Sequence, residues 1–363
     1  MMKALRRNHM GILLTTEMAP TPSIADLADD EALVRVVVAS VNPADIKAGG
    51  STPYSTGLDG AGIVVGERVG NCRNLLGKRV AWHGPLREMK NGRPQYGSFG
   101  EYAISKIHAL VEIPESMSFE TASILPCPGG TAAQIVDALD DAITAHGTIQ
   151  AVFMQGANGA VASLAVQLLK IRHPSLLVIG SVHPEAIEKR LFDNSPPFEP
   201  IPYGEQELPT LNRLRVERGI ELVGIVDFLG ETAQHHYDYL RDHGARRSVL
   251  VSVLSPPNTI TQNGPSLNVI ALGAAYDIAS EPDTPHHVFG YQDSEPILSM
   301  AQAYKKVIDL VAAGQVQPPP LREVNLEEMA TIVNGGSPLR GKPVMKFGEE
   351  ISIQSENFRS AIR

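Results

Sequence analysis

The stretch TIQAVFMQGANGAVASLAVQLLKIRHPSLLVIGSVHPEAIEKR, residues 148–190, decides the fold of this chain. An apolar run over 149–154 leads into a turn that contains Gly156 and Gly159. The spacing of an amphipathic helix follows, and then a second apolar run over 176–179. This order predicts two parallel β-strands joined by a helix, with a glycine turn after the first strand. Such a turn lets the backbone approach a pyrophosphate, and the helix N-terminus directs partial positive charge at it.

The turn departs from the usual fingerprint of three glycines. The spacing Ala157-x-Gly159-x-x-Ala162 has glycine only at the middle position, although alanine is tolerated at the third. An ordinary strand-to-helix turn of any α/β protein is therefore the alternative interpretation of this segment taken alone.

The end of the second strand bears on the choice of nucleotide. Proteins that bind NAD usually carry an acid about 20 residues after the glycines, which accepts hydrogen bonds from the ribose hydroxyls. Here the strand ends with Ser181, Val182 and His183, and Lys189 and Arg190 follow. A carboxylate would repel a 2′-phosphate, whereas a hydroxyl, an imidazole and cations accept one. We therefore expect NADPH, with Ser181, His183 and Arg190 near its 2′-phosphate.

The composition excludes several classes of protein. With 363 residues, 43% hydrophobic and 20% charged, the chain is long enough for two globular domains. The net charge of −9 and the lack of a dense basic patch argue against nucleic-acid binding. The apolar runs are too short to cross a bilayer, and the first residues lack the pattern of a secretory signal, so we expect a cytoplasmic protein.

The two cysteines, Cys72 and Cys127, exclude a disulfide scaffold and a four-cysteine zinc lobe. Cys127 lies in LPCPGGT. Its thiol could be reactive and close to a cofactor, but we favour the interpretation that it is a small buried apolar residue.

The rest of the chain surrounds the 148–190 segment with two kinds of structure. Residues before about 124 read as short strands punctuated by glycine and proline, which indicates a partly open β-barrel. After Ser118 come two helix patterns around the break PCPGGT and then alternating strands and helices, with strands expected at 149–154, 176–180, 222–228, 248–253 and 267–273. A long helix at 294–313, a short helix at 326–333 and a strand at 343–347 follow. We expect an α/β protein in which residues 125–281 form a doubly wound parallel sheet inserted into a domain made of 1–124 and 282–363.

Ordered landmarks now carry a family resemblance. They are ASVNPADIK (39–47), GLDGAGIVV (57–65), GKRVAW (77–82), GSFGEYA (97–103), LPCPGGTAA (125–133), QGANGAVAS (155–163), VDFLG (226–230) and the closing GKPVMKF. In this order the chain resembles the medium-chain dehydrogenase/reductase superfamily, in particular its zinc-independent quinone oxidoreductase and trans-acting enoyl reductase branch. The resemblance implies a GroES-like barrel and a Rossmann domain that binds NADPH.

The resemblance also bears on metal binding and chemistry. Zinc-dependent members carry Cys where this chain has Asn42, and a His-Glu pair where it has Leu58 and Asp59. Leucine cannot ligate zinc, so we expect no metal. Reduction of a conjugated C=C bond needs no Lewis acid, because hydride addition at the β-carbon gives an enolate that a hydrogen-bond donor can stabilise.

The resemblance implies catalytic roles for three residues. Lys47 matches a lysine that lines the active site of similar trans-acting enoyl reductases, although it could be a surface lysine. Thr131 matches a threonine that opens a helix beside the nicotinamide, where it could bond the carboxamide, cap the helix or do both. Tyr54 lies where the substrate cleft of the family opens and could donate a proton, but shape is its more ordinary role. Asn42 and Asp45 are expected to shape the loop before Lys47.

The resemblance assigns the cofactor site as well. Asn158, Gly159, Ala160 and Val161 are expected around the pyrophosphate, Leu229 near the adenosine or ribose, and Val253 and Leu254 near the nicotinamide ribose. We expect an NADPH-dependent reductase of an enone, a quinone or an enoyl thioester, in biosynthesis of a small metabolite or in detoxification. A redox-neutral cyclisation or isomerisation, and a non-catalytic NADPH-binding protein, are the alternatives. The substrate is a small molecule, carried on a protein or on CoA in the thioester case, and a homodimer through the strand at 267–273 is the expected assembly.

Overall fold

The computed structural model describes residues 1–7, 14–47, 55–68, 74–84, 96–143, 148–189, 198–253, 267–272, 294–334 and 341–347. Contacts divide the chain into two units. The first consists of Met1–Gly130 with Ile297–Arg363, and the second of Thr131–Pro296. The first boundary lies six residues after the expected one because the chain enters the second unit inside a helix. The expected second boundary at 281 lies outside the described residues.

The second unit is built on a six-stranded parallel sheet. Its strands are β8 (Gln150–Met154), β9 (Leu177–Val182), β10 (Glu199–Pro202), β11 (Glu221–Asp227), β12 (Ser248–Ser252) and β13 (Leu267–Ala271). They lie in the order β10-β9-β8-β11-β12-β13 and pair in parallel. This is the strand order of a dinucleotide-binding sheet, in which the winding reverses between the first and fourth strands and leaves a crevice at their carboxyl ends. The expected Rossmann fold is confirmed.

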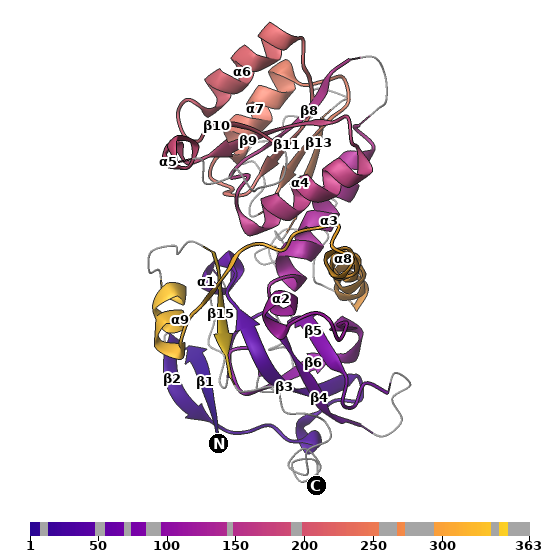
Figure 1. Ribbon diagram of the computed structural model, residues 1–363, viewed down its shortest axis with the longest axis vertical. Helices are drawn as coiled ribbons and strands as arrows, with labels where there is room; N and C mark the ends of the chain where they lie inside the picture. The colour runs from indigo at the N-terminus through magenta and orange to yellow at the C-terminus, as the bar shows by residue number, and fades with distance from the viewer. Residues whose placement is uncertain are drawn as a thin grey trace, which may run out of the picture. The chain divides into compact units, whose positions relative to one another are not determined.

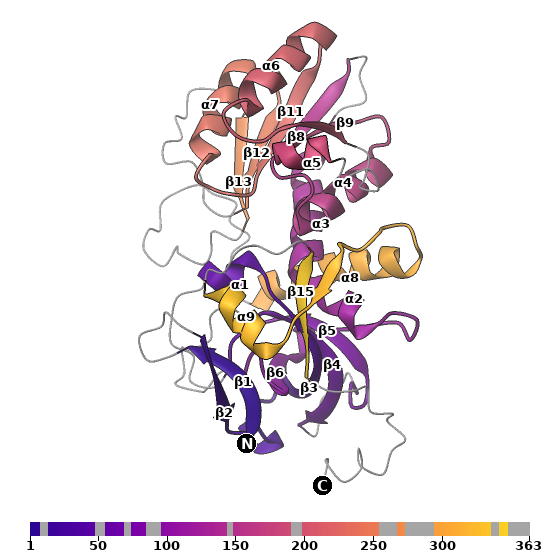
Figure 2. The same cartoon turned by 60° about the vertical axis from the view of Figure 1, so that its left-hand side comes forward.

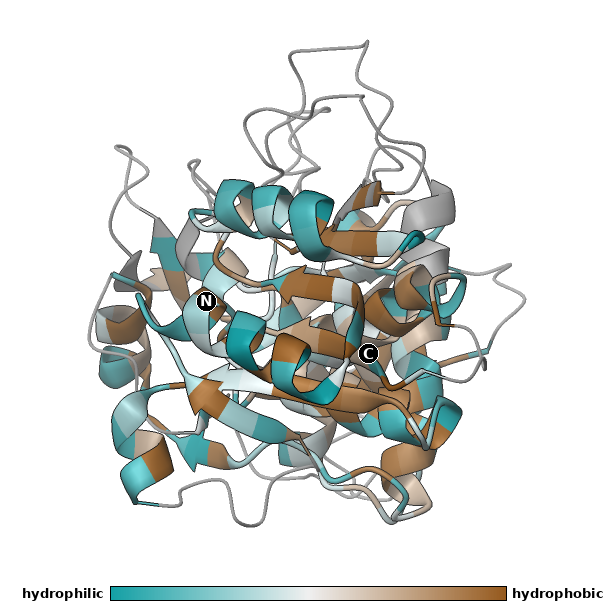
Figure 3. Cartoon of the chain, turned by 90° about the horizontal axis from the view of Figure 1, so that it is seen from above, coloured by the Kyte–Doolittle hydropathy of each residue, from teal (hydrophilic) through white to brown (hydrophobic). Residues whose placement is uncertain are grey.

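Helices cover both faces of this sheet. They are α4 (Ala160–Arg172), α5 (Pro184–Glu188), α6 (Glu207–Arg218) and α7 (Ala233–His243). Helices α6 and α7 lie on one face and α4 on the other (Figure 1). Because both faces are covered, the central strands are buried along their whole length, as in β8 and β12. The hydropathy colouring shows mostly hydrophobic strands, with helices in bands of mixed polarity (Figure 3).

The first unit is a twisted, mainly antiparallel β-structure. One sheet follows the order β14-β15-β3-β4-β5-β7, with β6 also pairing β3, and β1 and β2 form a separate hairpin. The strands are β1 (Met2–Arg7), β2 (Leu14–Ala19), β3 (Glu31–Ser40), β4 (Asp59–Glu67), β5 (Arg79–His83), β6 (Tyr102–Lys106), β7 (Leu110–Glu112), β14 (Leu321–Glu323) and β15 (Lys342–Lys346). The C-terminal β15 pairs antiparallel with β3, which brings the yellow end of the chain among the indigo strands (Figure 2). The core of this unit contains Trp82, Phe99 and Met329.

The remaining helices belong to the first unit or cross a unit boundary, and one of them corrects the sequence prediction. Helices α1 (Pro43–Lys47), α2 (Phe119–Ser123), α3 (Pro126–Asp140), α8 (Ser294–Ala312) and α9 (Leu326–Val333) and two short 3-10 turns, Ile24–Asp26 and Ile107–Ala109, complete the fold. PCPGGT was predicted as a break, but Pro126–Gly130 forms the first turns of α3 because proline is tolerated where a helix begins. A Cβ at Gly130 would lie 2.2 Å from Met300 Sδ, so the glycine lets α8 pack directly on α3.

Within the described part of the chain, none of the helices is both long and apolar enough to cross a membrane.

Candidate nucleotide-binding site

The turn between β8 and α4 has the backbone shape that the glycine spacing predicted. Gly156 takes the left-handed backbone conformation, with φ of +59°, which residues other than glycine rarely adopt. The N–H of Gly159 donates to the carbonyl of Gly156 at 2.8 Å and closes the turn. Gly159 is then the N-cap of α4. The chain therefore reverses within a few residues and presents the first turn of α4 at the carboxyl end of β8.

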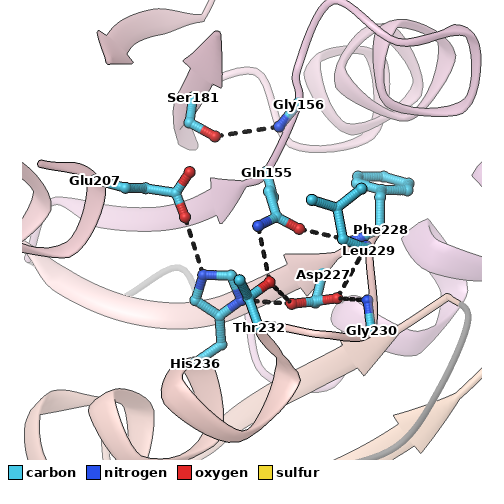
Figure 4. Close-up of polar contacts among 10 residues, drawn as sticks. All are labelled: Gln155, Gly156, Ser181, Glu207, Asp227, Phe228, Leu229, Gly230, Thr232 and His236. Atoms are coloured by element: carbon cyan, nitrogen blue, oxygen red, sulfur yellow. Dashed lines mark hydrogen bonds and ion pairs between the residues drawn. The ribbon is translucent and has the colours of Figure 1, made fainter. Parts of the chain in front are cut away.

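Two hydrogen bonds attach this turn to the neighbouring strand β9. The N–H of Gly156 donates to Ser181 Oγ at 3.1 Å (Figure 4). The N–H of Ala157 donates to the Ser181 carbonyl at 2.9 Å. Ser181 is fully buried. The structure thus shows Ser181 supporting the turn, whereas its contact with a 2′-phosphate stays a prediction.

The N-terminus of α4 can receive an anion. Asn158 and Gly159 are exposed, and Ala160 and Val161 are half-buried. N–H groups in the first turn of a helix have no acceptor within the helix, and the helix dipole adds partial positive charge there. Residues 158–161 therefore fit a pyrophosphate group through their backbone, without any charged side chain of their own.

The end of β9 carries an imidazole. His183 is exposed and caps α5, because its Nδ1 accepts the N–H of Glu185 at 3.3 Å. An Nδ1 that accepts leaves the Nε2–H of the neutral ring as a donor. Lys189 forms an ion pair with Glu185. One of the two carboxylates of this short helix, that of Glu185, is thus engaged by a lysine, and Arg190 lies outside the described residues.

Asp227 organises the turn that follows β11, next to β8 in the sheet. Its Oδ1 accepts the N–H groups of Leu229 at 3.1 Å and Gly230 at 2.6 Å. Its Oδ2 accepts the hydroxyl of Thr232 at 2.6 Å. Gln155, at the end of β8, accepts the N–H of Phe228 at 3.2 Å and donates to Thr232 Oγ1 at 2.9 Å (Figure 4). The loops after β8 and β11 are therefore fixed to each other at the reversal point of the sheet.

His236 continues this network into the interior. Its Nδ1 lies 2.7 Å from Asp227 Oδ2 and its Nε2 lies 3.1 Å from Glu207 Oε1. His236 is 1% exposed. Burial alone would lower the pKa of His236, but hydrogen bonds and charges from the two acids raise it above its ordinary value. Burial would raise the pKa of Asp227, yet bonds from His236, Thr232 and Gly230 lower it. Both shifts favour the charged form of each partner.

The sequence analysis missed this network. Of the two adjacent histidines on α7, His235 is exposed and His236 is buried. A signal was present, because His236 is spaced with Ala233, Tyr237 and Leu240 on the buried side of α7.

The other expected cofactor contacts are placed only in part. Leu229 is 41% exposed in the turn after β11, so its side chain is open to contact with a ligand. Val253 is half-buried directly after β12. Leu254 lies outside the described residues. These three contacts stay predictions.

The expected catalytic residues belong to the first unit and to helix α3, which leads out of it. Lys47 is the last residue of α1, and its side chain lies outside the described part of the structure, as does Tyr54. Thr131 is buried inside α3, which begins at Pro126. The suggestion that Thr131 caps a helix is therefore wrong, while its contact with the nicotinamide stays a prediction.

Buried polar side chains occupy the place of the metal site in zinc-dependent members. Asp45 accepts the N–H groups of Asn42 at 2.7 Å and Leu58 at 3.0 Å, so it shapes the loop as expected. Asp59 accepts from His83 and from the N–H of Cys127. The Lys342 ammonium donates to Asn42 Oδ1. Both oxygens of Asp59 thus have hydrogen-bond partners within the protein.

Comparisons with known proteins agree with this architecture. Residues 28–115 match the alcohol dehydrogenase GroES-like domain. The enoyl reductase component lovC of lovastatin nonaketide synthase from Aspergillus terreus is 30% identical over 46% of this chain and 48% of lovC. The chain thus spans about half the length of such relatives. The trans-enoyl reductase phm4 of Pyrenochaetopsis sp. is 25% identical over 91% of both chains.

Solved structures show the same fold over nearly the whole chain. A quinone oxidoreductase from Pseudomonas syringae pv. Tomato DC3000 superposes with a TM-score of 0.69, at 20% identity, covering 95% of this chain and 100% of the other. A mycobacterial protein complexed with NADPH gives a TM-score of 0.70, at 15% identity, with 95% and 100% covered. The chain therefore has the fold of the medium-chain dehydrogenase/reductase proteins, and its relatives are trans-enoyl reductases and quinone oxidoreductases, which confirms the resemblance.

Proposed function

We propose that this chain is an NADPH-dependent reductase of an activated C=C bond and works without zinc. The observation that carries the proposal is the pyrophosphate turn at residues 156–161, combined with an exposed imidazole in place of a carboxylate at the end of β9. A relative described as an enoyl reductase component and a similar fold complexed with NADPH support it.

The residues of the second unit would bind and orient the nucleotide. Backbone N–H groups at the start of α4 would receive the pyrophosphate, and the loop fixed by Asp227 would carry Leu229 to the ribose side. The Nε2–H of His183 would donate to the 2′-phosphate, while Glu185 is kept from repelling it by its ion pair with Lys189. NADPH, when bound, supplies the hydride that adds to the β-carbon of the substrate.

The first unit and α3 would complete the chemistry. The Lys47 ammonium would donate to the substrate carbonyl oxygen and stabilise the enolate charge. The Thr131 hydroxyl would orient the nicotinamide carboxamide. The Tyr54 hydroxyl would release a proton toward the α-carbon. The substrate classes are an enone, a quinone and an enoyl thioester.

The reaction is tested by incubating the protein with NADPH and one member of each substrate class. We expect loss of the near-ultraviolet absorbance of NADPH and a product heavier by two hydrogens. Substrate turnover without NADPH consumption would instead establish the redox-neutral reaction. Tight NADPH binding with no turnover across a broad panel would establish a binding protein.

The cofactor preference has its own test. His183→Asp places a carboxylate at the end of β9, and like-charge repulsion should weaken NADPH relative to NADH by about 10-fold. His235→Asp, an equal change of charge at an exposed histidine on α7, serves as the control. Equal affinity of the unmodified protein for NADH and NADPH would contradict the assignment of His183.

A further inference from the structure

A compact group of ionisable side chains surrounds Cys127 in the first unit. Asp59 on β4 and His83 on β5 face each other across the antiparallel pair, with carboxylate Oδ1 2.6 Å from imidazole Nδ1. The backbone N–H of Cys127 donates to the other oxygen, Asp59 Oδ2, at 2.9 Å. One donor atom of each residue, including the Cys127 sulfur, lies within 4.8 Å of the others. A carboxylate, an imidazole and a thiol thus form one compact group.

A buried cation adds to this group. Lys342 on β15 is 7% exposed, and its ammonium donates to the side-chain carbonyl of Asn42. Burial lowers the pKa of Lys342, while the charges of Asp59, Cys127 and Asp45 act in the opposite direction. The ammonium and the Cys127 sulfur are therefore near enough to interact, and a neighbouring cation favours the thiolate over the thiol.

The remaining acid nearby opposes the thiolate only weakly. Burial raises the pKa of Asp45 to about 7, so this carboxyl carries at most part of its charge near neutral pH. Asp59, by contrast, is matched by His83 and by the N–H of Cys127. Lys342 and His83 are thus the basic side chains grouped with the sulfur.

Cys127 as a residue is half-buried, not fully buried as expected from the sequence, and it is the second residue of the long helix α3. The helix N-terminus adds partial positive charge beside the sulfur. Nucleophilic cysteines in proteins combine an adjacent imidazole, a nearby cation and partial exposure.

We propose that Cys127 is a thiolate supported by Lys342 and the Asp59–His83 pair, and that it is a covalent modification site for α,β-unsaturated carbonyl compounds. His83 takes the thiol proton. The sulfur forms a C–S bond with the β-carbon, and the π electrons of the C=C bond move to give an enolate. The α-carbon takes a proton from water, and the His83 imidazolium gives its proton to the hydroxide that remains. The product is a thioether, and no oxidant or reductant is consumed. The addition consumes no NADPH, so it can be followed without the cofactor.

The first test compares the reactivity of Cys127 in the folded protein with its reactivity in the unfolded protein. The native and the urea-denatured protein are treated at pH 7 with iodoacetamide and, separately, with methyl vinyl ketone, and peptide mass spectrometry follows the Cys127 adduct. We expect the native residue to react about 10-fold faster than the denatured one, since thiolate is the reacting form. A native rate equal to or below the denatured rate overturns the proposal.

Two matched pairs of variants test the supporting groups. Lys342→Met should slow modification of Cys127 at least about 5-fold, whereas Lys346→Met, which removes an exposed cation of the same strand, should not. His83→Gln should act like Lys342→Met, and His173→Gln, which breaks the His173–Asp140 pair of the second unit, should not. Melting curves confirm that each variant is folded, and the comparison with the unmodified protein stands if one is not.

Metal analysis of the purified protein closes the test. The proposal expects a metal-free thiolate. Stoichiometric zinc that is lost in Cys127→Ser would overturn it, because a sulfur bound to zinc is a ligand and not a modification site.

Discussion

Each unit buries a histidine against an aspartate, but the surroundings of the two pairs differ. In the second unit His236 lies between Asp227 and Glu207, and these two acids surround one base. In the first unit the His83–Asp59 pair shares its interior with Lys342, Asp45 and Cys127. The arrangement around His236 fixes a loop, whereas the arrangement around His83 collects groups of both charge signs around a thiol.

The pKa directions express this difference. In the second unit partners outweigh burial, so the pKa of Asp227 is lowered and that of His236 is raised, and both charged forms are favoured. In the first unit burial dominates, so the pKa of Asp45 is raised to about 7 and that of Lys342 is lowered. A buried polar group can thus stabilise a fold when its partners match it, and it keeps protons exchangeable near neutral pH when they do not.

The largest expected effect comes from removing the centre of the second-unit network. Asp227→Ala leaves His236 without its closer carboxylate and leaves the N–H groups of Leu229 and Gly230 without an acceptor. Breaking a buried ion pair in this way should lower the free energy of unfolding by about 3–5 kcal/mol. Urea denaturation of the full chain measures it.

The control is Asp238→Ala, which breaks an exposed pair with Arg241 on α7. An exposed pair contributes less than about 1 kcal/mol. Equal losses for Asp227→Ala and Asp238→Ala would show that the buried network does not brace the unit.

The second prediction concerns Asp45 and pH. Its pKa is about 7 in the folded chain and near 3.8 in the unfolded chain, so the folded state binds the proton more tightly. The resulting stability is fully present below pH 3.8 and is lost as the pH rises to 7. Between pH 5 and pH 8 this loss is about 3 kcal/mol, at roughly 1.4 kcal/mol per pH unit up to pH 7. Denaturation midpoints at these two pH values measure it.

Asp45→Asn is the matched variant for this pH dependence. The amide does not titrate, so the loss between pH 5 and pH 8 should shrink even though the variant is less stable throughout. His236, with its raised pKa, also loses stabilisation at alkaline pH and remains in both proteins. An unchanged slope in Asp45→Asn would assign the whole effect to other groups.

The sequence predicted the parallel sheet well because its signals are local. Strands expected at 149–154 and 248–253 are found at 150–154 and 248–252, and the helix expected at 326–333 has those bounds. The glycine spacing likewise placed the turn at Gly156. Alternating apolar runs and turn residues specify these elements without knowledge of distant contacts.

The buried polar groups could not be predicted in the same way. Lys342 reaches Asn42 across 300 residues of sequence, and Asp59 meets His83 only because β4 pairs with β5. Such contacts depend on which strands pair and in what register, and the pattern of one strand alone does not specify its partner. The prediction of a break at PCPGGT was wrong for a similar reason. Gly130 lies inside α3 where Met300 of α8 packs against it, and this contact joins residues far apart in the sequence.

The third prediction distinguishes an effect of the nucleotide turn on NADPH binding from an effect on the stability of the fold. Gly156→Ala keeps open space around the new Cβ but forces a left-handed conformation, which costs about 1–2 kcal/mol. Gly219→Ala imposes the same conformation at the end of α6, also with open space. Both variants should lose similar stability, and only Gly156→Ala should weaken NADPH binding in a fluorescence titration. Equal NADPH affinity in the two variants would show that the turn does not contact the cofactor.

The smallest effect expected is that of Ser181→Ala, and it decides between two roles of one hydroxyl. The variant leaves the N–H of Gly156 without its acceptor, which should cost about 1 kcal/mol. If Ser181 only supports the turn, NADPH and NADH affinities fall by the same factor, because both nucleotides share the pyrophosphate. If its hydroxyl also contacts the 2′-phosphate, NADPH affinity falls further than NADH affinity. The complete burial of Ser181 favours the first result, and parallel titrations of the two nucleotides measure the ratio.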